Sequence, residues 1–384
     1  MRSTFRIPRS ARPIVLLGVW LGCATVSAED VAERVTFRQN GEALMVAGRV
    51  LVEAQDGGIL LLGRDGRLWN VLPDELQSRE TTSEAFTPFS PEELGSQLQS
   101  ELGEGFTVHQ SRHYVLCTNA GTLYAEWCGS LFDRLYAAFE THWHSRDLRL
   151  TEPELPLGAI LFATRKQFAE YAAKDVGPEM AEALGYYSVR TNRMVLFDLT
   201  ADEGEEPART PADITRKLAE SPLNVATIVH EATHQIAFNR GLHVRYADNP
   251  LWLSEGMAMY FETPDLTNRS GWRTVGQVNR GRLARFRDFA RNRRAADSLQ
   301  TLIASDERFT NAETAADAYA EAWALSYCLI KTRRRQYVEY LNRIARKPRL
   351  VWDTPEERWA EFQEVFGDTQ RLEQEFLRHA ARLR

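Results

Sequence analysis

The chain has 384 residues, of which 26% are charged and 43% belong to the hydrophobic set, and its formal net charge is −6. This balance excludes a globally basic nucleic-acid binder, and the lack of a long apolar run after the N-terminus excludes a multi-span membrane protein. The length suits two or three domains, or one large domain with an added module.

The N-terminus has the pattern of a secretory signal. Four arginines precede an apolar stretch at 13–21, and Val26-Ser27-Ala28 offers small residues for cleavage. We therefore expect residues 1–28 to be a signal peptide and the protein to be exported, either periplasmic or extracellular. A lipoprotein anchored through Cys23 is the lesser alternative, because Trp20 stands where a lipidation box prefers leucine. Without the signal, the formal net charge is about −10, which does not suit attachment to anionic lipid.

Residues 29–76 are expected to form a small antiparallel β module. Turn signals at 56–58 and at Asp65-Gly66 separate short runs rich in Val, Leu and Ile. No residue here suggests chemistry, so we interpret the module as a packing appendage rather than a binding module. The Ser-, Thr- and Glu-rich residues 77–105 are expected to form a linker with a short helix at 91–102.

A larger unit is expected from 106 to 384. Strands are predicted at 113–117, 157–162 and 193–199, and helices at 121–143 and 165–174, before a surface loop at 201–212 and a mostly helical remainder. Strands first and helices afterwards predict an α+β fold, with a mixed sheet and helices and then a helical part. For Cys117 and Cys128, the sequence leaves a disulfide and two buried thiols as equal alternatives.

A helix expected to begin at Ser221-Pro222 and to end near Gly241 carries an HExxH motif. The spacing of four places His230 and His234 on one helix face, one turn apart, where two imidazoles can share one zinc ion. Glu231 lies beside them and can reach a water on that metal. The alternative is a helix with two surface histidines.

A third ligand is needed for a catalytic zinc site. The metzincin continuation is excluded, because Ala237 and Arg240 stand where glycine and histidine would be required. A second helix, opening at Asn249-Pro250, carries Glu255 among apolar neighbours. A carboxylate is costly to bury there unless it is paired or bound to metal, so we predict that Glu255 is the third ligand, with an ordinary salt bridge as the alternative.

HExxH followed about twenty residues later by the segment Trp252–Glu262 resembles the gluzincin metallopeptidases. It is most similar to the small peptidase MA-like group and to an exported bacterial domain family of unknown function. A looser likeness extends from 113 to 329. The resemblance implies a zincin-like metallopeptidase domain that binds one Zn²⁺ through His230, His234 and Glu255.

One position departs from the thermolysin-like pattern. Met259 replaces the aspartate that supports a ligand histidine four places after the third ligand. A supporting carboxylate must then come from elsewhere, and Glu262 and Asp248 are the candidates, with a solvated surface position equally open for each.

The expected mechanism uses a zinc-activated water, with Glu231 as general base. Zinc peptidases of this type usually add a donor for the developing oxyanion. The residues eligible by type are Tyr186, Tyr187, His243, Arg245 and Tyr319. The strand at 193–199 is a candidate for a sheet edge that holds an extended peptide, and an internal strand is the alternative.

We therefore expect a secreted or periplasmic zinc metallopeptidase that acts on a peptide or protein, with no nucleic-acid partner and no membrane span once the signal is removed. The alternatives are a non-catalytic binding or scaffold protein with a zincin fold, and a zinc hydrolase of a non-peptide cell-wall amide. Glu231 and the lack of an evident fourth ligand favour catalysis over a structural site. Residues 29–105 could also serve as a pro-region over the cleft, and the oligomeric state is left open.

Overall fold

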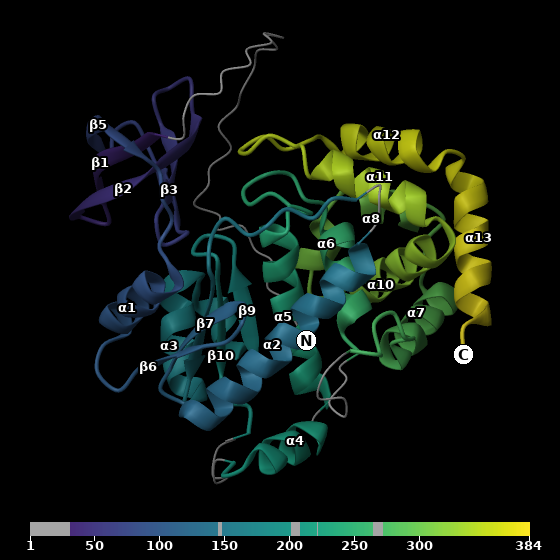
Figure 1. Cartoon of the computed structure of the whole chain (residues 1–384). Coiled ribbons are helices and arrows are strands. Elements are labelled where there is room, and N and C mark those ends of the chain that lie inside the picture. The colour runs from purple at the N-terminus through teal and green to yellow at the C-terminus, as the bar shows by residue number, and fades with distance from the viewer. Residues whose placement is uncertain (1–30, 145–147, 201–207, 221, 264–271) are drawn as a thin grey trace.

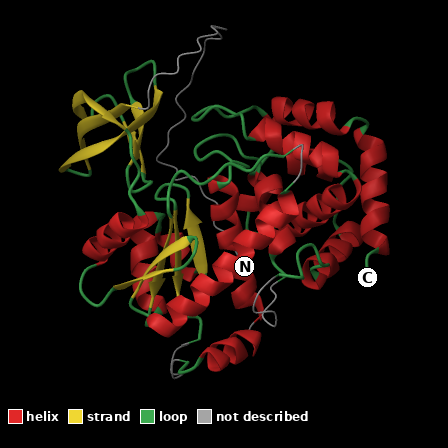
Figure 2. Cartoon of the chain, in the orientation of Figure 1, coloured by secondary structure: helices red, strands yellow, loops and turns green. Residues whose placement is uncertain are grey.

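The computed structural model describes residues 31–144, 148–200, 208–220, 222–263 and 272–384. It contains two β-sheets followed by a helical C-terminal half (Figure 1, Figure 2), so the expected α+β class is confirmed. The expected signal peptide, Cys23 and the helix cap at Ser221 lie outside the described residues.

The first sheet is an antiparallel module of five strands in the order β4-β3-β2-β1-β5. Its strands are β1 (Val31–Gln39), β2 (Glu42–Glu53), β3 (Ile59–Gly63), β4 (Leu68–Val71) and β5 (Leu76–Ala85). The two expected turns are present, and each contains a glycine with positive φ, Gly57 at 89° and Gly66 at 85°.

The expected linker at 77–105 is wrong in part. β5 lies within it and pairs with β1, but the side chains of β5 are mostly exposed, so the strand lacks the alternating apolar pattern that would have revealed it. Helix α1 (Pro91–Leu102) has the predicted bounds, and it begins with a capping box formed by Ser90 and Glu93. It packs on the second sheet. The residues of the expected linker therefore belong to the two neighbouring units.

The second sheet has the order β6-β7-β8-β10-β9. Its inner strands β7, β8 and β10 run parallel, and β6 and β9 are antiparallel edge strands. The strands are β6 (Thr107–Gln110), β7 (Tyr114–Thr118), β8 (Leu157–Phe162), β9 (Gly185–Ser188) and β10 (Arg193–Phe197). The expectation of a peptide-binding edge at 193–199 is wrong, because β10 is internal and β9 forms the edge.

Helices cover both faces of this sheet. One face packs against α2 (Thr122–Trp143) and α5 (Pro222–Asn239), and the other against α1 and α3 (Arg165–Asp175). A 3₁₀ turn, η1 (Pro178–Glu182), precedes β9. Of the loop expected at 201–212, residues 201–207 lie outside the described part, and Pro211 already begins helix α4 (Pro211–Glu220).

Cys117 and Cys128 lie on opposite faces of the second sheet. Cys117 on β7 packs toward α1 and α3, whereas Cys128 on α2 belongs to the core on the opposite face. The disulfide alternative is therefore wrong: Cys117, Cys128 and Cys328, the cysteines of the described residues, are all free and buried. Successive residues of a strand face opposite sides of the sheet, and this turns the Cys117 thiol away from α2.

We expect these three thiols to resist alkylation in the folded protein. Burial raises the pKa of Cys117 to about 11, and it raises the pKa of Cys128 and Cys328 as well, so the reactive thiolate is scarce. Iodoacetamide followed by peptide mass spectrometry should find all three unmodified in the native protein and fully modified after denaturation without reductant. Thiols that appear only after a reductant is added would contradict this.

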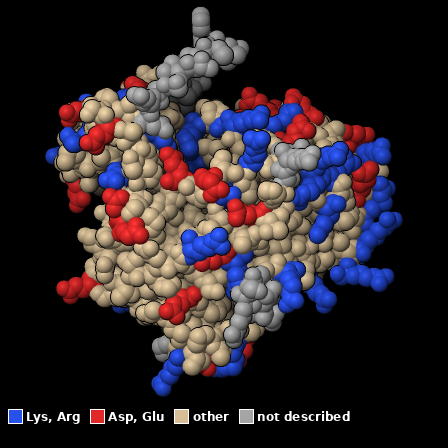
Figure 3. Space-filling view, in the orientation of Figure 1, with Lys and Arg blue, Asp and Glu red and all other residues tan. Residues whose placement is uncertain are grey.

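The C-terminal half is built from helices. They are α6 (Leu251–Phe261), α7 (Arg280–Asn292), α8 (Ser298–Ala304), α9 (Glu307–Thr310), α10 (Ala315–Thr332), α11 (Arg334–Ile344), α12 (Pro355–Phe366) and α13 (Thr369–Arg382). Lys and Arg side chains gather over the outer helices of this half in the view of Figure 3. Within the described residues, no helix combines the length and apolar character needed to cross a bilayer.

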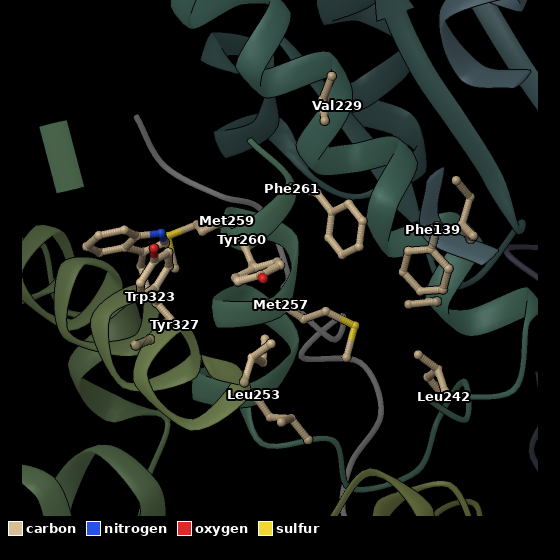
Figure 4. Packing of buried hydrophobic residues seen from close by; sticks show 14 of the residues in the cluster. Phe139, Val229, Leu242, Leu253, Met257, Met259, Tyr260, Phe261, Trp323 and Tyr327 are labelled. Carbon is tan, nitrogen blue, oxygen red and sulfur yellow. The ribbon is translucent and has the colours of Figure 1, made fainter. Parts of the chain in front are cut away.

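Helix α6 is buried on all sides, because every residue from Leu251 to Phe261 is buried. In Figure 4, Phe261 points toward Phe139 of α2, while Tyr260 lies on the side of Tyr327 of α10. A helix that is apolar all round belongs inside a protein, and here its position is fixed from both directions. This fixes the position of Glu255, which α6 carries.

Candidate metal centre

Helices α5 and α6 bring three potential ligands together. The Nε2 atoms of His230 and His234 lie 3.0 Å apart, because the residues are one helical turn apart on α5. Glu255 reaches them from α6, with its Oε2 atom 3.0 Å from His230 Nε2 and its Oε1 atom 3.6 Å from His234 Nε2. All three residues are buried, and this group could hold a metal ion.

The pKa values of Glu255 and His230 are shifted by burial and by each other's charge. Burial would raise the pKa of Glu255, but His234 and His230 outweigh it and hold that pKa far below its ordinary value. Burial would likewise lower the pKa of His230, but hydrogen bonds with Glu255 and Glu262 raise it to about 10. Two nitrogen donors and one anionic oxygen are a set of atoms that could hold a metal ion.

Glu262 supports His230 from the end of α6. Its Oε1 atom lies 2.9 Å from His230 Nδ1. A carboxylate only accepts hydrogen bonds, so with a metal ion on Nε2 the ring would carry its proton on Nδ1 and donate it to Glu262. Glu262 is held in turn by Arg282 of α7, whose Nη2 lies 3.1 Å from Oε1, and by Asn279, whose Nδ2 donates to Oε2 at 3.1 Å.

The other candidate for this supporting role, Asp248, lies elsewhere. Its carboxylate pairs with Arg358 and with Lys347, the latter at 3.2 Å. These cations tie the start of α6 to the C-terminal helices, so the carboxylate is already engaged and does not contact a ligand histidine. The expectation for Asp248 is therefore wrong.

Glu231 is buried next to the ligands. Its Oε2 atom accepts a hydrogen bond of 2.9 Å from the backbone N–H of Tyr187, which belongs to edge strand β9. Burial raises the pKa of Glu231 above its ordinary value, and the nearby histidines act against this. The carboxylate is thus fixed in orientation and is a stronger base than an exposed glutamate.

A cavity of about 110 Å³ opens beside these groups. It brings together side chains from α5, α6, α7 and α10 and the backbone that leads into β9. Its lining residues are Glu182, Ala183, Leu184, Gly185, Thr227, His230, Glu231, Glu262, Arg282 and Tyr319. Of the five proposed oxyanion donors, Tyr319 alone is among these lining residues.

The remaining four point into the fold. The Tyr186 hydroxyl donates to Asp175, and the Tyr187 hydroxyl donates to Asn192 at 2.7 Å. His243 packs against the ring of Phe238, with ring centroids 5.3 Å apart, and Arg245 donates to the carbonyl oxygen of Gly66. Tyr187 contributes its backbone N–H, a role that residue type could not have indicated.

Arg282 is the residue of the site that the sequence did not single out. It lies on α7, far along the chain from the motif, in a helix with many arginines. Only the packing of α7 on α10 brings it to the cavity, where its guanidinium also lies 5.9 Å from the centroid of the Tyr319 ring. No local pattern distinguishes it from its neighbours.

We expect Glu262→Gln to lower the affinity for zinc by about tenfold to a hundredfold, the usual effect of removing a carboxylate that supports a ligand histidine. Asp248→Asn is the matched control, since this second buried carboxylate does not contact the ligands. Competition with a fluorescent zinc chelator measures both. Equal losses in the two variants would mean that the effect is one of general stability.

Part of the chain matches a known family. Residues 224–350 match the family described as "Protein of unknown function (DUF1570)". This span is about a third of the chain and includes His230, Glu231, His234, Glu255 and Tyr319, but neither β9 nor the β module. Curated proteins compared with the chain gave no match.

Proposed function

We propose that this protein is a zinc-dependent metallopeptidase. The observation that carries the proposal is the convergence of His230, His234 and Glu255 beside Glu231, whose carboxylate is buried and held by a backbone N–H. A structural metal site has no use for such a base and tends to close its fourth position with a further ligand. The resemblance of HExxH and its downstream helix to gluzincins supports the same class.

The residues present fit zinc. The donors are two imidazole nitrogens and one carboxylate oxygen, and the outer nitrogen of His230 meets a carboxylate, as is usual for zinc-binding histidines. A zinc ion in such a site supplies a Lewis acid and lowers the pKa of a bound water toward neutrality.

The other steps belong to the protein. Glu231 would take a proton from the attacking water and return it to the leaving amine, and the Tyr187 N–H keeps the carboxylate in place for both transfers. Tyr319 and Arg282 line the cavity, and we assign their hydroxyl and guanidinium as the donors to a developing oxyanion. Arg282 also pairs with Glu262.

The substrate class is a peptide or protein, and the N-terminal pattern supports a site of action outside the cytoplasm. The test combines metal analysis with cleavage. Zinc is measured in the wild type and in Glu231→Gln, and both are incubated with unfolded casein and a mixed peptide library. We expect one zinc per chain in both proteins, with cleavage by the wild type and at least about a hundredfold less by the variant.

Glu152→Gln, a change at a largely exposed glutamate outside the cavity, is the control and should leave both measurements unchanged. A wild type that binds no zinc at neutral pH would overturn the whole proposal. A wild type that binds zinc but cuts none of the substrates would favour the scaffold alternative.

A further inference from the structure

We propose that the N-terminal β module positions the candidate general base. The β3–β4 hairpin, residues 63–68, holds the β9–β10 turn, residues 188–193, and the turn fixes the strand whose N–H binds Glu231. The module is then a working part of the site. This inference rests on the proposed function only in its last step, where Glu231 acts as a base.

The hairpin contacts the turn through its backbone. The N–H of Leu68 donates to the carbonyl oxygen of Arg190 at 2.7 Å, and Arg245 Nη1 donates to the carbonyl oxygen of Gly66 at 2.8 Å and to that of Val189 at 3.3 Å. Arg245 is buried and therefore clamps both segments at once.

A buried ion pair strengthens the same junction. Arg193, which is 1% exposed, donates from Nη2 to Asp65 of the hairpin at 3.1 Å and from Nη1 to Glu101 of α1. A cation so deeply buried is costly to leave without its partners, so the hairpin and the start of β10 are expected to move as one unit.

An apolar core continues across the junction. Leu60, Leu62, Leu68 and Phe86 of the module pack with Leu155, Tyr246 and Leu350 of the larger unit in one buried cluster. The module in Figure 1 therefore adjoins the larger unit through shared packing as well as through hydrogen bonds.

The turn is attached to the metal-binding helix on its other side. Asn192 has a left-handed backbone, with φ of 59°, and its Oδ1 atom accepts hydrogen bonds from the Tyr187 hydroxyl at 2.7 Å and from Asn239 at 2.8 Å. Gln235, directly after His234 on α5, donates to the Asn192 carbonyl oxygen at 2.8 Å. A residue in this conformation persists because its surroundings fix it, so the turn and α5 hold Asn192 between them.

The final link is the edge of the sheet. Tyr187 is paired with Met194 of β10 on one side, and no strand of the described residues lies beyond β9. The outward N–H of Tyr187 is therefore available to Glu231 and donates to it at 2.9 Å. Among the described residues that line the cavity, none comes from the module, so it supports the site from the side and does not cover it as a pro-region would.

Two glycines of the module provide a matched test. Gly66 and Gly57 both occupy hairpin turns with positive φ, so an alanine strains both turns alike. A Cβ on Gly66 would lie 3.5 Å from Asn192 Cβ and 3.3 Å from Leu155 Cδ1, whereas a Cβ on Gly57 would meet nothing within 4 Å. The contact with Asn192 is an ordinary one, and the contact with Leu155 is tight by a few tenths of an ångström, so Gly66→Ala presses mildly on the junction. Gly57→Ala controls for turn strain.

The first measurement is hydrogen exchange of the full chain. We expect faster exchange of the amides at 185–192 in Gly66→Ala and no change there in Gly57→Ala. Asp65→Asn leaves the hairpin backbone unstrained and should move the same amides in the same direction. Unchanged exchange at 185–192 in Gly66→Ala, or the same increase in Gly57→Ala, would overturn the coupling.

The second measurement separates positioning from folding. With casein peptides as substrate, kcat of Gly66→Ala should fall by up to about tenfold, less than the roughly hundredfold loss expected for a catalytic group displaced by about 1 Å, while KM and bound zinc stay unchanged. Faster exchange with an unaltered kcat would overturn the positioning of the base. If the wild type cuts nothing, the proposed function fails, and hydrogen exchange still decides whether the module is coupled to β9.

Discussion

Glu255→Gln is expected to abolish stoichiometric zinc binding at neutral pH. The substitution keeps the shape of the side chain but removes the only negative charge among the three ligand atoms, leaving two neutral imidazoles. The affinity should fall by more than about a hundredfold, because that is the upper range for losing a carboxylate that only supports a ligand. Equilibrium dialysis against buffered zinc gives the affinity directly.

Glu321→Gln is the matched control for this change. Glu321 is as deeply buried as Glu255, and it lies on α10 between Arg294 and Arg308, away from the cavity. Its loss should lower the stability of the fold, since Arg294 and Arg308, both partly buried, lose the buried charge with which they pair, but it should leave zinc binding intact. If both variants lost zinc equally, buried charge and not ligation would explain the result.

The sequence was sufficient for the parts of the site that local spacing determines. His230, Glu231 and His234 lie within two helical turns, and Asn249-Pro250 correctly marks the start of the helix that carries Glu255. Such features need no knowledge of tertiary packing. The predicted strand at 157–162 and the helix at 91–102 also agree with the structure, because an apolar run and a capping residue can be recognised within a short segment. The expected cap by Asn249 is wrong, because Pro250 is the N-cap residue and Asn249 Oδ1 accepts from the Val244 N–H instead.

Features that depend on long-range packing were not predictable in the same way. Arg282 reaches Glu262 only because α7 packs on α10, and the Tyr187 N–H meets Glu231 only because β9 is the edge strand. Strand order in particular is set by how the sheet assembles, and residues 193–197 look the same in sequence whether their strand is central or at the edge. The surface-exposed β5 was missed for a related reason. It lies at the edge of the first sheet, where it pairs with β1, and its mostly exposed side chains give no alternating apolar pattern.

Gly256→Ala should destabilise the fold by about 2 kcal/mol and weaken metal binding with it. A Cβ at this position would lie 2.1 Å from Ser326 Oγ and 2.7 Å from the Ala322 carbonyl oxygen. The hydroxyl can rotate away, but the backbone oxygen of α10 cannot, so α6 and α10 must separate. In an open helix the same change would be favourable by about 1 kcal/mol, so any net loss reports the close contact itself.

Gly281→Ala supplies that comparison. This glycine is exposed in the first turn of α7, and its added Cβ would meet only Asn279 Oδ1, at 3.6 Å. Urea unfolding should show a lower midpoint for Gly256→Ala and an equal or higher one for Gly281→Ala. Adding Ser326→Gly to Gly256→Ala should restore part of the loss, because two of the three crowded atoms belong to that side chain. Since Glu255 directly precedes Gly256, the affinity for zinc should be lower in Gly256→Ala than in Gly281→Ala. An unchanged urea midpoint in Gly256→Ala would show that the packing of α6 on α10 does not depend on this contact.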